Sequence, residues 1–126
     1  MENNVVGWFE IPVTEMDRAK KFYETVFDIE ISVHDMGELT MGWFPFAEGK
    51  SGATGSLVEH KDFYFPSENK GALIYFSCTD VQMQLDRIPS AGGQILQPKK
   101  QIGDGHGYMA LFIDSEGNRV ALHSQK

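Results

Sequence analysis

A single carboxylate, Glu10, stands in the middle of an otherwise apolar run, "GWFEIPVT" at residues 7–14. The run has the residue types of a β-strand, and a carboxylate buried there without a partner would be costly, so a partner is expected. A carboxylate in this setting can serve as a metal ligand, a general base, an anchor for a ligand or one half of a salt bridge. The residue types alone leave these four roles open.

The four histidines and the single cysteine add few candidates. His123 lies near the end of the last predicted strand, where it can be a satisfied histidine, or an acid, a base or a donor to a ligand. His34, His60 and His106 lie in charged or loop segments and are expected to face solvent or loops. Cys78 ends the apolar run "LIYFSC", which favours a small buried thiol over a nucleophile. With no spaced pair of histidines, no Glu-x-x-His and no cysteine cluster, the sequence lacks a strong metal signature.

Aromatic residues gather on predicted strands and on the segment 60–70. Many of them must form the core, but a cleft lined by aromatic side chains with a few polar groups suits a small, partly apolar molecule. Trp43 and Phe44 are adjacent on a predicted strand and therefore point to opposite faces. One of the two is expected to pack against a helix while the other reaches the cleft.

The elements that must position these residues repeat along the chain, because residues 7–14 fall on residues 72–79 at an offset of 65. In each half the strand runs into an amphipathic helix, whose start is marked by Thr14 with Asp17 and then by Thr79 with Gln82. At the same offset, "MGWFPF" from Met41 falls on "HGYMAL" from His106. The sequence therefore predicts one domain over residues 1–126, with strand, helix, strand, strand, strand at 5–59 and again at 71–124, joined by a linker at 60–70.

Composition narrows the class of partner. The 126 residues suffice for one compact domain with a normal core. The net charge is −7, with 18 acidic and 11 scattered basic residues, so no basic stripe is present that could follow a nucleic acid. The N-terminal sequence has no signal-peptide pattern, and nowhere do about 18 apolar residues run together. A cytoplasmic protein without membrane contact is expected.

The duplicated unit resembles the vicinal oxygen chelate superfamily, which includes glyoxalases, bleomycin-resistance proteins and ring-cleaving dioxygenases. The motifs that carry this resemblance are "MDRAKKFYETVF", "AGGQIL" and "FIDSEGNRVALH". The resemblance covers nearly the whole chain and is closest to bacterial glyoxalase-like proteins of single-domain size. It implies an α+β fold in which two βαβββ modules form a curved mixed sheet around a cleft, and it implies a homodimer.

Enzymes of this superfamily hold a divalent metal with His, Glu or Gln side chains on the first and last strand of each module. Oxygen and imidazole ligands at four such points suit an open site that binds adjacent substrate oxygens. The resemblance places these points at Trp8, Ser56, Leu73 and Ala121, none of which is a competent metal ligand. No metal ligand is assigned, and the cofactor is unknown with a divalent metal left open. The departure from the family's ligand set argues against lactoylglutathione lyase activity.

Strand alternation extends the predicted site. Side chains two residues apart share a face, so Glu10, Tyr75 and His123 join the cleft next to the positions that correspond to metal ligands. Glu10 and His123 are the predicted catalytic pair. The residues predicted to line the ligand are Trp8, Trp43, Ser56, Tyr75 and Ala121. Two functions follow: a glyoxalase-like enzyme, of lyase or isomerase type, acting on an unidentified small organic molecule, or a protein that binds and sequesters a drug or antibiotic without chemistry.

Overall fold

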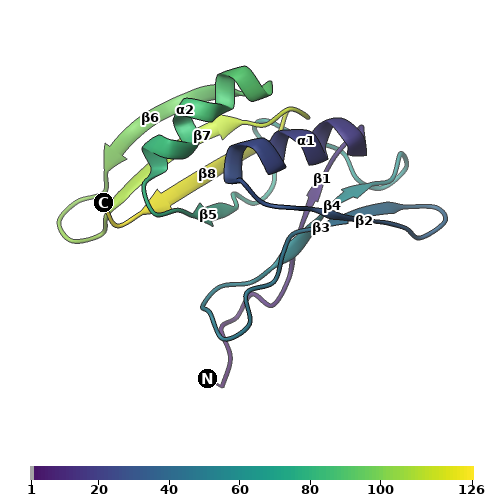
Figure 1. Cartoon of the computed structure of the whole chain (residues 1–126), viewed down its shortest axis with the longest axis horizontal. Coiled ribbons are helices and arrows are strands. Elements are labelled where there is room, and N and C mark those ends of the chain that lie inside the picture. The colour runs from purple at the N-terminus through teal and green to yellow at the C-terminus, as the bar shows by residue number, and fades with distance from the viewer. Residues whose placement is uncertain (1) are drawn as a thin grey trace.

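Helices and strands follow the same order twice in the computed structural model, which describes residues 2–126. Met1, the first residue of the predicted domain, lies outside the described residues. The first module consists of β1 (Phe9–Pro12), α1 (Met16–Phe27), β2 (Ser32–Asp35), β3 (Thr40–Trp43) and β4 (Gly55–Glu59). The second consists of β5 (Tyr75–Ser77), α2 (Val81–Ala91), β6 (Gln94–Gln101), β7 (Tyr108–Ile113) and β8 (Arg119–Ser124) (Figure 1).

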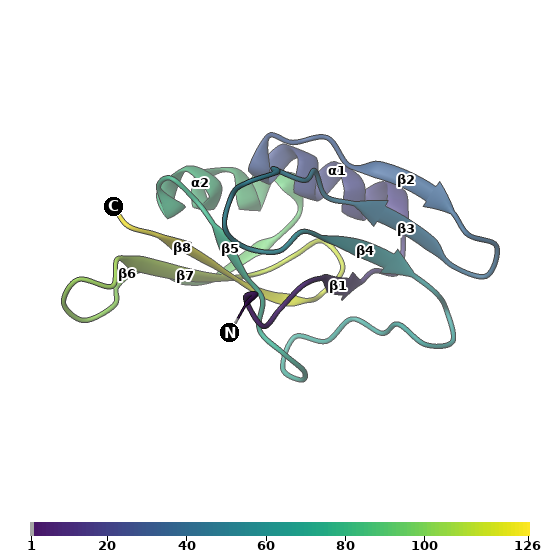
Figure 2. The same ribbon diagram turned by 90° about the horizontal axis from the view of Figure 1, so that it is seen from below.

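Each module forms its own four-stranded mixed sheet. The strand orders are β1-β4-β3-β2 and β5-β8-β7-β6, and only the β1/β4 and β5/β8 pairs are parallel. Both helices lie on one side of the sheets, and the linker between the modules runs along the other side (Figure 2). The predicted α+β fold of two βαβββ modules is confirmed, with the eight strands of the described chain divided between two sheets.

The strand registers show how far the repeat extends. Glu10 pairs with Ser56, and Tyr75 pairs with Ala121, so the offset of 65 holds for the first and last strands of the modules. In the third strands it does not hold, because Gly42 pairs with Leu57 whereas Ala110 pairs with Leu122, residues 42 and 110 being 68 apart. The predicted alignment of Met41 with His106 is therefore wrong by three residues. The bulged β6 and the turn after it are longer than β2 and its turn, which accounts for the shift.

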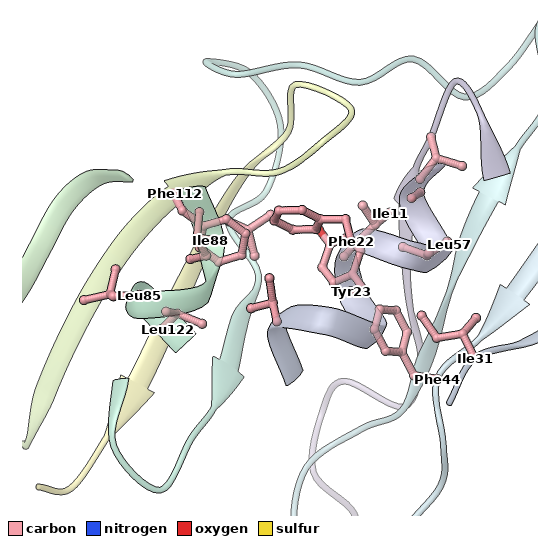
Figure 3. Close-up of a cluster of buried hydrophobic side chains, with 14 of the residues drawn as sticks. Ile11, Phe22, Tyr23, Ile31, Phe44, Leu57, Leu85, Ile88, Phe112 and Leu122 are labelled. Carbon is pink, nitrogen blue, oxygen red and sulfur yellow. The ribbon is translucent and has the colours of Figure 1, made fainter. Parts of the chain in front are cut away.

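An aromatic cluster joins the two modules. The ring of Phe76 on β5 lies 4.6 to 5.8 Å, centroid to centroid, from the rings of four first-module residues: Phe9, Tyr23, Phe27 and Phe44. Figure 3 shows Phe22 and Tyr23 of α1 between the side chains of the two modules. Phe44 is buried against Tyr23 while its neighbour Trp43 lies exposed on the opposite face, as predicted for this pair. Neither helix of the described residues is long and apolar enough to cross a membrane.

The hairpin between β7 and β8 docks on the first module. Its buried Asp114 accepts hydrogen bonds from the Tyr23 hydroxyl at 2.6 Å and from the Asn118 amide at 2.8 Å. The Asn118 side chain donates to the Pro12 carbonyl at 2.7 Å, which fixes the end of β1 against the start of β8. Burial raises the pKa of Asp114, although these hydrogen bonds oppose the rise. The "DSEGN" sequence thus binds the two halves together as well as turning the chain.

Candidate functional site

The face of the first sheet that points away from the helices carries both tryptophans of the chain. Trp43 and Glu10 both pair with Ser56, so these three side chains share one face. The Trp8 indole joins them, because its Nε1–H donates to Glu10 Oε2 at 3.2 Å. Trp8 is 44% exposed and Trp43 is 37% exposed, while Ser56 is fully buried beneath them. This face offers aromatic surface around one carboxylate.

Glu10 is held by two neutral donors. The Tyr64 hydroxyl donates to Glu10 Oε1 at 2.6 Å, and the Trp8 indole occupies the other carboxylate oxygen. The hydrogen bond to Glu10, followed by burial and the charge of that carboxylate, raises the pKa of Tyr64. The partner expected for Glu10 is thus a phenol from the linker and not a cation. Tyr64 belongs to the aromatic segment 60–70, but no local pattern in the sequence indicates this contact.

The second sheet carries the other predicted residues. Tyr75 is 52% exposed and pairs with the buried Ala121, whose amide donates to the Ile74 carbonyl at 2.9 Å. His123 pairs with Ser77 and Met109, and its Nε2 lies 2.8 Å from the His106 carbonyl oxygen. The imidazole is therefore engaged by the turn that precedes β7.

A pocket of about 210 Å³ lies where β1, the linker and the start of β8 meet. Its lining includes Glu10, Phe65, Ser67, Lys70, Ile74, Asn118 and Arg119. Glu10 thus shares a pocket with Arg119, whereas His123 is four residues further along β8, roughly 13 Å at the rise of a strand. The described contacts do not bring Glu10 and His123 together, so their pairing stays a prediction. Arg119 was missed, although it lies two residues before Ala121 and the same alternation rule would have found it.

The four positions that correspond to metal ligands do not fit a metal. Trp8 presents an indole N–H, which is a donor, and Leu73 and Ala121 have no ligand atom. The Ser56 hydroxyl lies 2.7 Å from the Leu57 carbonyl oxygen and 3.2 Å from the Gly42 carbonyl oxygen, which leaves it engaged within the sheet. Among residues 2–126, no three His, Cys, Asp or Glu side chains gather into a group that could hold a metal ion.

Comparison with known proteins gives one family and several similar folds. Residues 5–122 match the family model described as Glyoxalase/Bleomycin resistance protein/Dioxygenase superfamily. The fold is similar to glyoxalase I from Zea mays, with a TM-score of 0.72, 21% identity and coverage of 94% of this chain and 45% of that one. This chain therefore spans about half the length of the maize enzyme.

Two further structures are similar over nearly their full lengths. The hypothetical protein SA1046 from S. aureus has a TM-score of 0.72 and 20% identity, with coverage of 96% of this chain and 94% of that one. TnmS3, an antibiotic binding protein from Streptomyces sp. CB03234, has a TM-score of 0.68 and 20% identity, with coverage of 100% and 99%. No curated protein matches the sequence. At these identities the structures establish the fold.

Proposed function

The chain belongs to the glyoxalase/bleomycin resistance protein/dioxygenase superfamily, and on this premise we propose that it binds a small, partly apolar organic molecule at Trp8, Glu10 and Trp43. One observation carries the proposal: both tryptophans lie part-exposed on one sheet face around a carboxylate held by Trp8 and Tyr64. Exposed aromatic rings offer apolar area, and a fixed polar group orients what binds there. The similarity to an antibiotic binding protein of the same length supports a binding function.

Binding at this face proceeds without the four-point metal centre of the family. The support is the set of side chains at those points, an indole, an engaged hydroxyl and two aliphatic groups, none of which supplies a metal ligand. Elemental analysis of protein purified without chelators is expected to show no stoichiometric divalent metal. One equivalent of bound metal would demonstrate a ligand set other than these four residues.

Tryptophan fluorescence tests the binding proposal directly, because the only two tryptophans of the sequence lie on the proposed face. Titration with bleomycin and with a panel of small aromatic compounds is expected to give a saturable change in emission for at least one of them. Mass spectrometry of the released compound then separates two functions: an unchanged compound indicates sequestration, and a converted one indicates an enzyme. A panel without any saturable change contradicts the proposed face.

An enzymatic function has one specific observation in its favour, the 2.6 Å contact between the Tyr64 hydroxyl and Glu10. A carboxylate oriented by a phenol can accept a proton from a bound molecule, and such a base contributes about 10²- to 10⁴-fold to a rate. For a compound found to be converted, Glu10→Gln is expected to lower kcat by this factor while leaving the Kd within about threefold.

Tyr64→Phe is the matched variant for this test. It removes the hydroxyl and keeps the carboxylate, so it is expected to lower kcat by less than Glu10→Gln does. His123 stays a proposed second catalytic group, and His123→Gln should lower kcat only if its imidazole leaves the His106 carbonyl during turnover. Undiminished turnover in Glu10→Gln would remove Glu10 from the mechanism.

We further propose a homodimer. Exposed Phe46, Phe63 and Leu96, which the proposed ligand site does not use, leave apolar surface, and such surface is often covered by a partner. Sedimentation equilibrium should then give twice the 14.2 kDa mass of the chain.

A further inference from the structure

Two cations of the 210 Å³ pocket have no carboxylate partner. The four salt bridges of residues 2–126 engage Arg18, Lys20 and Lys99, and none includes Lys70 or Arg119. Glu10 is the single carboxylate that lines this pocket, and its two oxygens already accept from Tyr64 and Trp8. The pocket therefore carries a net positive charge in a protein whose overall charge is −7.

Backbone hydrogen bonds attach the chain to β8 on both sides of Lys70, the last residue of the linker. On one side the Arg119 amide donates to the Ser67 carbonyl at 3.3 Å, and on the other the Ala121 amide donates to the Ile74 carbonyl at 2.9 Å. The Ser67 hydroxyl also accepts from the Lys70 amide at 3.0 Å, which closes a turn over residues 67–70. Both ends of the segment 68–73 are therefore fixed to β8, and Lys70 in this segment lines the pocket.

The apolar lining residues and the volume of the pocket determine which kind of anion fits. Phe65 and Ile74 supply apolar surface, so the pocket suits an organic body better than an inorganic ion. The volume of about 210 Å³ is smaller than the ~300 to 1,000 Å³ of drug-sized sites, so the ligand group that enters must be small. Glu10 lines the same pocket, where it can accept a hydrogen bond from a hydroxyl or an ammonium group.

We propose that this pocket binds the carboxylate of a small organic acid. Arg119 holds the two carboxylate oxygens through its planar fork, and Lys70 adds a second positive charge. The rest of the acid lies along Phe65 and Ile74 and reaches the aromatic face through Glu10, the residue that the pocket shares with the face of Trp8 and Trp43. The inference rests on the proposed function, since it assigns a substrate class, aromatic or other apolar organic acids, to that same site.

Three planar compounds of nearly equal shape test the charge preference: benzoate, neutral benzamide and cationic benzamidine. Chemical-shift titrations at low ionic strength are expected to give a Kd for benzoate at least about tenfold lower than for benzamide, and weaker binding still for benzamidine. The benzoate affinity should fall as salt is added, while the benzamide affinity should not. Equal Kd values for benzoate and benzamide would overturn the inference.

Substitutions test whether Arg119 and Lys70 cause the preference for benzoate over benzamide. Arg119→Gln and Lys70→Gln are each expected to raise the benzoate Kd about tenfold and to leave the benzamide Kd within about twofold, and Arg119→Lys should recover part of the loss. Lys21→Gln, at an exposed lysine of α1 outside the pocket, is the matched control and should change neither value. Lys70 is exposed on the linker, so Lys70→Gln should not affect folding. It therefore tests the inference even if Arg119→Gln lowers the stability of β8.

The failures of the two proposals are distinguishable. If the aromatic panel changes the tryptophan emission but benzoate shows no advantage over benzamide, the acid preference is wrong and the binding face stands. If benzoate binds through Lys70 and Arg119 but no compound reaches the tryptophans, the pocket stands and the face is wrong.

Discussion

Replacing Glu116 by glutamine is expected to lower the free energy of unfolding by about 2 to 4 kcal/mol, because one buried carboxylate joins the two modules. Glu116 lies in the hairpin of the second module, and its side chain is fully buried. It accepts from the Thr14 and Glu15 amides, each at 2.9 Å, and from Arg18 Nε at 2.7 Å. The two amides share Oε1 while Arg18 Nε donates to Oε2, so glutamine removes the charge and turns its N–H₂ group either toward the amides or toward Arg18.

Glu15→Gln is the matched control for this substitution. Glu15 also pairs with Arg18, at 3.4 Å, but its side chain is exposed, so its loss is expected to cost below about 0.5 kcal/mol. Urea unfolding at neutral pH measures both variants. Equal midpoints for Glu116→Gln and Glu15→Gln would show that the hairpin does not hold the modules together.

Glu116 also determines how the stability of the protein changes on acidification. Burial raises the pKa of Glu116, but the hydrogen bonds from Arg18 and from the Glu15 and Thr14 amides outweigh burial and lower the pKa below its ordinary 4.5. A group whose pKa is depressed by folding stabilises the folded state above its unfolded pKa and loses that contribution as the pH falls through its folded pKa. The wild-type stability should therefore fall on acidification below 4.5, and Glu116→Gln should show a shallower fall over the same range.

Helix existence was predictable from the sequence, whereas helix capping was not. The spacing of apolar residues from Met16 to Phe27 is local information and predicted α1 correctly. The predicted cap at Thr14 is wrong, because the first residue outside the helix is Glu15 and it makes no side-chain cap. Glu59 accepts from the Met16 amide instead, and Glu116 accepts from the two amides before it, and both come from strands and turns distant in sequence.

In the candidate site, too, features set by local sequence were predictable, whereas contacts between distant segments were not. Strand alternation predicted that Glu10 and Trp8 lie on the same face, and the hydrogen bond between them agrees with this. The prediction was possible because the two-residue period of a strand depends only on the backbone. The neighbours of Glu10 across the module boundary depend on how the linker and β8 pack. Alternation along β8 could have placed Arg119 on the same face as Ala121, but Tyr64 and Lys70 come from the linker, and no local pattern in the sequence indicates that they meet β1.

Gly55→Ala is expected to lower the free energy of unfolding by about 3 kcal/mol, because no side chain fits between β1 and β4. Gly55 pairs with Phe9, and a Cβ at residue 55 would lie 2.6 Å from Phe9 Cγ and still closer to the Phe9 carbonyl oxygen. The carbonyl is backbone and cannot rotate away, so β1 must separate from β4. Phe9 would then lose its contacts with Phe44 and Phe76 in the cluster that joins the modules.

Gly7→Ala provides the control, because a Cβ at residue 7 meets no atom within 4 Å and the change lies two residues before the start of β1. It should leave stability and ligand binding unaltered, while Gly55→Ala weakens benzoate binding even where the protein stays folded, since Glu10 moves with β1. Thermal unfolding and a benzoate titration of both variants measure these effects. A Gly55→Ala protein with the stability of the Gly7→Ala protein would mean that β1 is not held on β4 by the observed register, and Glu10 would then lose the neighbours on which both proposals depend.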